Sequence, residues 1–161
     1  MNRTADKLLE LARSESANPA NQSSANVLQI IRLLVSDLGF RPSQICIDIP
    51  DMIQVTTDID AIGILIKNLL ENAFKYSEGD EAIHVIWEQG ALVVQNRTRT
   101  ITDSDKAMIL KRGVKLESRG HGLGLSIAET IAMRLGLEFH IEIETINDAS
   151  SLFKASLRLN S

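Results

Sequence analysis

The stretch Asn68-Leu-Leu-Glu-Asn-Ala-Phe-Lys-Tyr-Ser77 is the most informative one for the fold and function of this chain, together with Gly120-His-Gly-Leu-Gly-Leu-Ser126 further along. The first stretch places two amides and a lysine at helical spacing. The second is a glycine-rich loop that runs directly into a helix. Backbone N–H groups at the start of a helix attract anions, and phosphate is the ligand that we expect there. Together the two stretches predict a site for a phosphorylated ligand.

The apolar period predicts a helix over residues 59–76. Its broad apolar face, which we expect to pack on a sheet, consists of Ile59, Ile62, Ile66, Leu69, Leu70 and Ala73. Polar residues at spacings of three and four form the opposite face: Asn68, Glu71, Asn72 and Lys75. Asparagine is a poor helix former, so two of them in mid-helix indicate a ligand-binding face. A merely solvated helix back stays open as the alternative.

The glycine loop does not fit the two common nucleotide motifs. It lacks the Gly-Lys-Ser/Thr ending of a P-loop, and its glycines do not follow Gly-x-Gly-x-x-Gly after a strand. Residues 111–120 before it are polar and aperiodic, which predicts a mobile loop. Residues 123–135 after it have a helical apolar period that Gly136 ends.

Periodicity supplies the other elements. We expect helices over 4–14, 26–38 and 102–109, a polar linker over 16–24, a hairpin of 83–87 with 91–95, and strands over 45–49, 139–143 and 153–159. In the first helix Leu8, Leu9, Leu11 and Ala12 should cluster on one side. Helices gathered on one face of a mostly antiparallel sheet predict an α+β, two-layer sandwich with about five strands and about three helices.

Composition restricts the class of protein. The 161 residues are 44% hydrophobic, which suits one domain with a full core. A net charge of -4 gives no broad basic field for nucleic acid or anionic lipid. No apolar run reaches the roughly 20 residues that span a bilayer, and the N-terminus does not resemble a signal peptide. We expect a cytoplasmic protein with a buried, reduced Cys46 and no direct membrane contact, whether or not its parent is anchored in the inner membrane.

The two motifs resemble those of the catalytic and ATP-binding domain of bacterial sensor histidine kinases, in the superfamily of DNA gyrase, MutL and the heat-shock chaperone ATPase. Residues 68–77 resemble the N box, residues 120–126 the second glycine box, and Thr57-Asp58 the approach to the N box. The resemblance implies a Bergerat-type ATP-binding fold over residues 25–161. Residues 1–15 would then be the end of a dimerisation helix, and residues 16–24 a linker.

The resemblance also implies roles for the polar helix face. Asn72 would bind Mg²⁺, Lys75 would neutralise phosphate charge, and Tyr76 would lie over the nucleotide. Asn68 stands where the hydrolytic ATPases of the superfamily carry a glutamate that activates water. An amide cannot take that proton, so ATP should be held without hydrolysis. Glu71 would assist the transfer or form a salt bridge with Lys75.

The remaining nucleotide contacts implied by the resemblance come from the glycine loop and the sheet. They are Asn96, Ile101, Arg112, Gly120, His121, Gly122, Leu123, Gly124, Leu125 and Ser151. The loop is also basic, and its cations either clamp phosphates or lie in solvent: Lys111, Arg112, Lys115 and Arg119.

One segment departs from the family pattern. Asn96-Arg-Thr-Arg-Thr100 stands where such kinases carry Asp-x-Gly-x-Gly, so an amide replaces the aspartate that accepts from the adenine amino group. Similarly, Ser150-Ser-Leu-Phe153 stands where Gly-Thr-x-Phe is usual. A neutral acceptor is weaker than a charged one by roughly 1 kcal/mol.

The implied function is transfer of the ATP γ-phosphoryl group to a histidine on a dimerisation domain, and from there to a response regulator. None of His84, His121 and His140 lies on a helix ahead of the N box, so the acceptor histidine would be supplied elsewhere. Two alternatives stay open. One is a scaffold that has lost useful nucleotide affinity, and the other is a serine-directed kinase of the anti-sigma type.

From the Asn96 substitution we predict that ATP binds in the high micromolar range or weaker, with reduced discrimination between adenine and guanine. Calorimetric titration with ATP and with GTP, each with Mg²⁺, measures both quantities. Tight binding that is strictly selective for adenine would contradict this expectation.

Overall fold

The computed structural model describes residues 9–10, 12–110 and 122–159 of the chain. Their main feature is a five-stranded sheet in the order β2-β4-β5-β7-β6. Its strands are β2 (Ile45–Asp48), β4 (Ile83–Glu88), β5 (Ala91–Arg99), β7 (Ser150–Arg158) and β6 (Phe139–Asn147). All neighbours in this order are antiparallel except β2 and β4, which are parallel. The expected α+β sandwich is confirmed.

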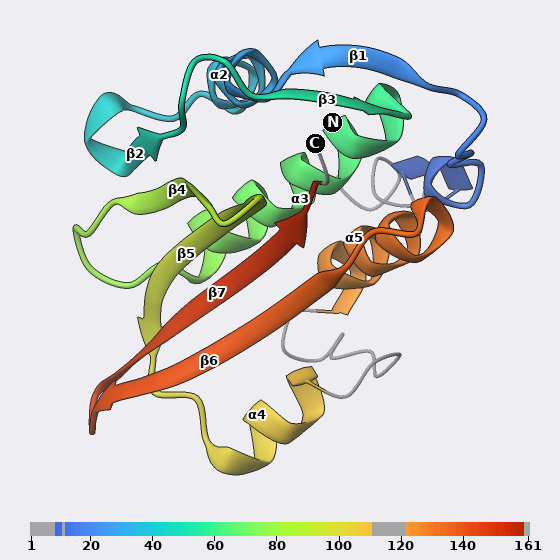
Figure 1. Cartoon of the computed structure of the whole chain (residues 1–161). Coiled ribbons are helices and arrows are strands. Elements are labelled where there is room, and N and C mark those ends of the chain that lie inside the picture. The colour runs from blue at the N-terminus through green and yellow to red at the C-terminus, as the bar shows by residue number, and fades with distance from the viewer. Residues whose placement is uncertain (1–8, 11, 111–121, 160–161) are drawn as a thin grey trace.

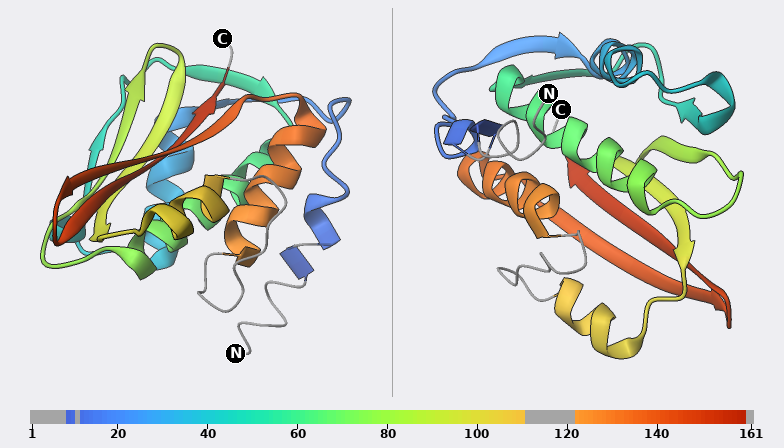
Figure 2. Two further views of the ribbon diagram at one scale, coloured as in Figure 1. Left: turned by 90° about the horizontal axis from the view of Figure 1, so that it is seen from below. Right: turned by 180° about the vertical axis from the view of Figure 1, so that it is seen from behind.

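The helices lie on one face of this sheet, as the two further views show (Figure 2). They include α2 (Val27–Leu38), α3 (Ile59–Tyr76), α4 (Asp103–Leu110) and α5 (Gly122–Leu135), and residues 9–10 and 12–14 are also helical. Local chemistry sets their ends. Asn26 caps α2 through a bond from the Gln29 N–H, and Gly39 and Gly136 follow α2 and α5 with positive φ angles of 74° and 70°. No helix in the described ranges is both long and apolar enough to cross a membrane.

A second, two-stranded sheet was not expected from the sequence. It pairs β1 (Ser23–Asn26) with β3 (Gln54–Thr57) in antiparallel register. Ser23 and Ser24, which we expected in the linker, therefore begin a strand. Both strands are short and mostly polar, and only Val55 among their residues is buried, so neither carries the apolar alternation that predicts a strand.

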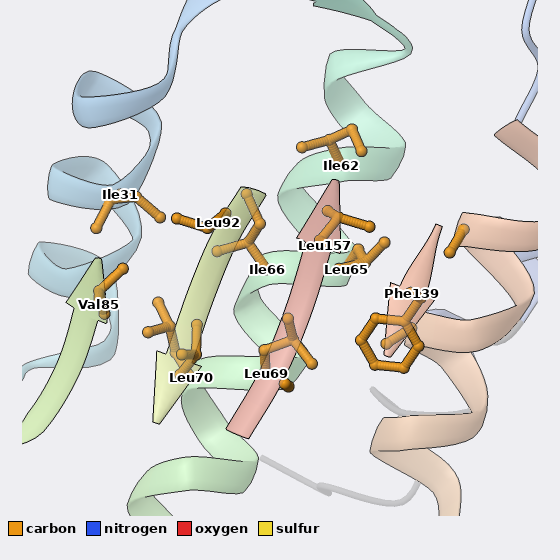
Figure 3. Packing of buried hydrophobic residues seen from close by; sticks show 14 of the residues in the cluster. Ile31, Ile62, Leu65, Ile66, Leu69, Leu70, Val85, Leu92, Phe139 and Leu157 are labelled. Carbon is orange, nitrogen blue, oxygen red and sulfur yellow. The ribbon is translucent and has the colours of Figure 1, made fainter. Parts of the chain in front are cut away.

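The core lies between α3 and the sheet (Figure 3). Ile62, Ile66 and Leu70 of α3 are completely buried, as are Leu92 of β5 and Leu157 of β7, which are register partners. Burying one such side chain stabilises a fold by roughly 1.5–3 kcal/mol. The predicted apolar face of residues 59–76 thus fixes α3 across the middle of the sheet (Figure 1).

The apolar face expected for the first helix is wrong at the two of its residues that the structure describes, Leu9 and Ala12. Leu9 is 53% exposed and Ala12 is exposed, whereas Glu10 and Ser14 are buried. Leu8 and Leu11 lie outside the described residues. Glu10 is buried because the surface that it meets on α3 is itself polar, as the hydrogen bonds below show.

The expectation of a buried thiol was also wrong, because Cys46 is exposed. It alternates along β2 with Ile45, which is buried, and Ile47, which is half-buried. Successive side chains of a strand point to opposite faces, so the isoleucines take the helix side and the cysteine takes the open face of an edge strand.

Gly63 provides a test of how α3 is stabilised. It lies inside the helix, and a Cβ added there would meet nothing within 4 Å. Gly63→Ala should therefore raise the free energy of unfolding by about 0.5–1 kcal/mol, measured by denaturant titration. Gly39→Ala is the matched control, because its φ of 74° makes the same substitution strained. Destabilisation by Gly63→Ala would show that α3 requires a bare backbone at that turn.

Candidate functional site

The polar face of α3 is buried in its middle. Asn68 is 1% exposed and Asn72 is 9% exposed, although both are asparagines inside a helix. Glu71 is half-buried, and Lys75 is exposed at the end of the row. The alternative of a solvated helix back is therefore excluded for the two amides.

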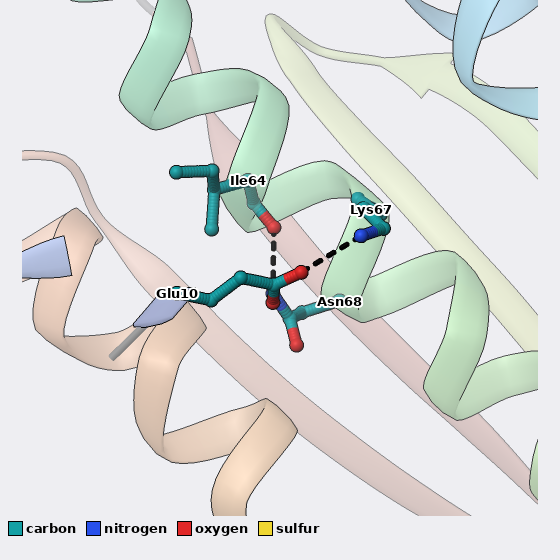
Figure 4. Close-up of polar contacts among 4 residues, drawn as sticks. All are labelled: Glu10, Ile64, Lys67 and Asn68. Atoms are coloured by element: carbon teal, nitrogen blue, oxygen red, sulfur yellow. Dashed lines mark hydrogen bonds and ion pairs between the residues drawn. The ribbon is translucent and has the colours of Figure 1, made fainter. Parts of the chain in front are cut away.

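Both amide hydrogens of Asn68 are engaged. Its Nδ2 donates to the backbone carbonyl of Ile64 at 2.8 Å and to Oε2 of Glu10 at 2.9 Å. The other oxygen of Glu10 accepts from Nζ of Lys67 at 2.8 Å. Figure 4 shows this cluster, in which a carboxylate from the N-terminal segment reaches the middle of α3.

Sequence reasoning missed Glu10. It lies far from residue 68 in the chain, and the helix that contains it was interpreted from its leucines. No spacing rule connects an acid in one helix with an asparagine in another when the packing of the two helices is unknown. A buried acid in this position could be found only from the fold.

The start of α5 lies against the same amide. A Cβ added to Gly124 would come 3.5 Å from Oδ1 of Asn68, which is ordinary van der Waals contact. Leu125, one residue on, is buried in the core cluster. The structure thus brings Gly124 of the second motif to Asn68 of the first, as the sequence predicted. Gly122 and Leu123 begin the same helix.

Several predicted residues lie outside the described ranges: Arg112, Gly120 and His121, with the basic residues Lys111, Lys115 and Arg119. Lys75 and Tyr76 are described, and Nζ of Lys75 lies 5.4 Å from the centroid of the Tyr76 ring. A cation at this distance from a ring face is attracted by it. Within the described ranges, His, Cys, Asp and Glu side chains form no group of three that could hold a metal ion.

The sheet contributes a polar end to its buried face. Along β5 and β7 the buried register partners change from Leu92 with Leu157 to Asn96 with Phe153, and then to Thr98 with Ser151. Asn96 is 2% exposed, and neither Nδ2 nor Oδ1 finds a hydrogen-bond partner in the described part of the chain. Leaving such a group unsatisfied costs roughly 1–3 kcal/mol. A buried carboxamide without a partner suits an external ligand that both donates and accepts.

Ser151 and Ile101 meet beside this position. Oγ of Ser151 accepts from the backbone N–H of Ile101 at 3.2 Å, and Oγ1 of Thr98 donates to the carbonyl of Arg99 at 2.8 Å. These bonds hold the chain where β5 ends and turns toward α4. Ser151 and Ile101, which the sequence analysis expected at the nucleotide, thus also determine the course of the chain beside Asn96.

Comparison with known proteins places this geometry in a family. Sensor protein kinase GraS of Staphylococcus aureus (strain MRSA252) is 30% identical over 95 residues, which cover 54% of this chain and 28% of that protein. Sensor protein kinase CarS of Pseudomonas aeruginosa (strain PAO1) is 30% identical over 97 residues, which cover 58% of this chain and 22% of that protein. The chain therefore spans less than a third of the length of these two relatives.

Solved structures share the fold. A mycobacterial sensor histidine kinase, MprB, has a TM-score of 0.64 at 18% identity, with 86% of this chain and 98% of that chain covered. The cytoplasmic segment of histidine kinase QseC has a TM-score of 0.62 at 20% identity, with 97% and 89% covered. At these identities the likeness concerns the fold alone.

The family model described as histidine kinase-, DNA gyrase B-, and HSP90-like ATPase matches residues 57–161. This match begins at the Thr57-Asp58 approach to α3 and includes both motifs, Asn96 and the last four strands of the large sheet. The chain is thus an ATPase domain of the histidine kinase type, and it belongs to the family of histidine kinase-, DNA gyrase B- and HSP90-like ATPases.

Proposed function

We propose that this chain binds ATP with Mg²⁺ in the cytoplasm and transfers the γ-phosphoryl group to a histidine on a dimerisation domain, for relay to the receiver domain of a response regulator. One observation carries the proposal. The buried amide oxygen of Asn68 on α3 lies beside Gly124 at the start of α5, so a side-chain oxygen and helix-start N–H groups are available to one ligand. The names of the relatives, which are sensor protein kinases, support it.

At this site Mg²⁺ would take the amide oxygen of Asn72 together with phosphate oxygens and water, because it is a hard cation that prefers oxygen ligands. Bound Mg²⁺ neutralises charge on the phosphates. Lys75, at the exposed end of the row, adds a second positive charge, and Tyr76 would lie over the nucleotide.

The chemistry itself needs little from the protein. An imidazole nitrogen of the incoming histidine forms a bond to the γ-phosphorus while the bond to the bridging oxygen breaks, and ADP leaves. Catalysis of this step is mainly positioning and charge neutralisation. Asn68 offers no base to water, so the phosphoryl group is kept for the histidine. Glu71, one turn from Asn68, would orient the incoming group.

Asn96 would hold the base. Its Oδ1 accepts from the amino group of adenine, and its Nδ2 donates to a ring nitrogen, which satisfies both atoms that lack partners. If the amide turns over, the same two atoms match the carbonyl and N–H of guanine. This symmetry is the physical basis of the weak base discrimination expected from the sequence.

One feature favours a second candidate function, a scaffold with little kinase activity. β5 continues as a regular strand through Arg99, which pairs with Ser150 of β7. Of the two positions where the resembled kinases carry glycines, Thr98 is extended and pairs with Ser151, and Thr100 follows the strand with its N–H bonded to the carbonyl of Ala149 at 3.3 Å. A domain that cannot open this strand would dock partners without binding nucleotide.

We predict that Asn72→Ala lowers the rate of phosphoryl transfer at least about tenfold, because the metal would lose its protein ligand. The assay mixes the chain with labelled ATP, Mg²⁺ and a separately produced histidine-bearing dimerisation domain. Gly63→Ala in the same helix is the control, and circular dichroism checks the fold. Unchanged transfer by the Asn72 variant would remove the metal role, and no transfer by the wild-type chain would favour the scaffold.

We predict opposite effects of Asn96→Leu on stability and binding. Replacing an unsatisfied buried amide by an apolar side chain of similar size should raise the free energy of unfolding of the nucleotide-free chain by about 1–3 kcal/mol. The same variant should lose the rise in unfolding temperature that Mg-ATP gives the wild-type chain. Thermal unfolding with and without nucleotide measures both. A variant that is less stable, or that still responds to ATP, contradicts the role of Asn96.

A further inference from the structure

The N-terminal segment, residues 9–10 and 12–18, is attached to the candidate site at three places. Glu10 bonds to the middle of α3. The carbonyl of Ala17 accepts from Nε of Arg134 on α5 at 3.0 Å, and the N–H of Asn18 donates to Asp58, the N-cap of α3, at 3.1 Å. Ser14 and Ala17 are buried between these points. The segment therefore lies along both helices that form the site.

Glu10 determines how Asn68 presents its side chain. A primary amide has two hydrogens, and those of Asn68 go to the carbonyl of Ile64 and to Glu10. With both fixed, the plane of the amide is fixed as well, and Oδ1 is turned toward Gly124. If Glu10 were absent, one hydrogen would lose its acceptor and the amide could rotate about its last torsion.

The charge of Glu10 is balanced locally. Its side chain is 10% exposed, and Lys67 pairs with the oxygen that Asn68 does not use. A buried carboxylate is costly unless it is paired and hydrogen-bonded, and here it is both. The pair therefore adds little net charge beside the triphosphate, and the effect of Glu10 on nucleotide is one of orientation rather than repulsion.

We propose that Glu10 is a positioning residue for the ATP site, which acts by fixing the amide of Asn68 in the orientation that faces the start of α5. The inference rests on the proposed function. It makes docking of the N-terminal segment and binding of Mg-ATP mutually dependent. By linkage, each strengthens the other by the same factor.

The test uses the full 161-residue chain and three forms. Glu10→Ala removes the acceptor for Asn68. The double variant Glu10→Gln with Lys67→Met is the matched control, because glutamine keeps an oxygen for Asn68 while the ion pair is removed. We expect the Kd for Mg-ATP, measured by calorimetry, to rise about tenfold in Glu10→Ala and to stay within about twofold of wild type in the double variant.

A second measurement reports on orientation without nucleotide. In the wild-type chain and the double variant, the side-chain NH₂ signals of Asn68, assigned with Asn68→Asp, should exchange slowly with solvent. In Glu10→Ala they should exchange faster, while backbone amides of α3 stay protected. If a variant is destabilised as a whole, the backbone amides of α3 lose their protection too, so this measurement distinguishes general destabilisation from a change at Asn68 alone.

The outcomes separate the two claims. If the wild-type chain binds no Mg-ATP, the proposed function fails and the positioning role fails with it. If the wild-type chain binds and Glu10→Ala binds equally well, only the positioning role is overturned. If the double variant loses as much affinity as Glu10→Ala, the ion pair rather than the amide orientation controls binding, and the proposal is again wrong.

Discussion

The structure depends on α3 being buried on two sides for different reasons. One side carries isoleucines and leucines that pack on β5 and β7, and this contact orders the sheet and the helix layer. The other side carries two buried amides, of which Asn68 lies beside Gly124 of α5. A helix held only by its apolar side could rotate slightly on the sheet. The hydrogen bond from Asn68 to Glu10 on the second side opposes that rotation, and so helps to set the direction in which the polar row points.

The site needs both layers of the fold. In the proposed site, the helix layer would supply amides and helix-start N–H groups for phosphates, and the sheet would supply Asn96 for the base. The helix layer and Asn96 come together on β5, because the buried side chains of this strand change from apolar to polar partway along it. The apolar half of that row of side chains packs against α3, and the polar half is the part that would contact a ligand in the proposed site. One part of β5 thus contributes to the stability of the fold, and the other part would contribute to ligand binding.

The sequence predicted most of the fold because its long elements have clear periods. The helix over 59–76 was placed correctly, as were the hairpin of β4 with β5 and the pair β6 with β7. It did not predict β1 and β3, whose few polar residues are held by pairing rather than by an apolar face. It also mistook the exposure of Leu9 and Cys46, because exposure depends on what lies opposite a residue.

For the site, motif spacing predicted that Asn68 and Gly124 meet, since both lie on helices whose apolar faces share one core. The contribution of Glu10 could not be predicted, because it depends on how a short helix packs on α3. The partnerless state of Asn96 could not be predicted either. A sequence shows which residue replaces an aspartate, but only the packed sheet shows that nothing within the described chain satisfies it.

The two outermost strands of the large sheet bear on self-association. β2 has four residues and is closely followed by Pro50, and β6 places His140, Glu142 and Glu144 on exposed positions. Short borders and repeated acidic charges discourage a second molecule from adding its own strand. Both edges of the large sheet are therefore protected against strand addition, and so against the start of fibril formation at high concentration.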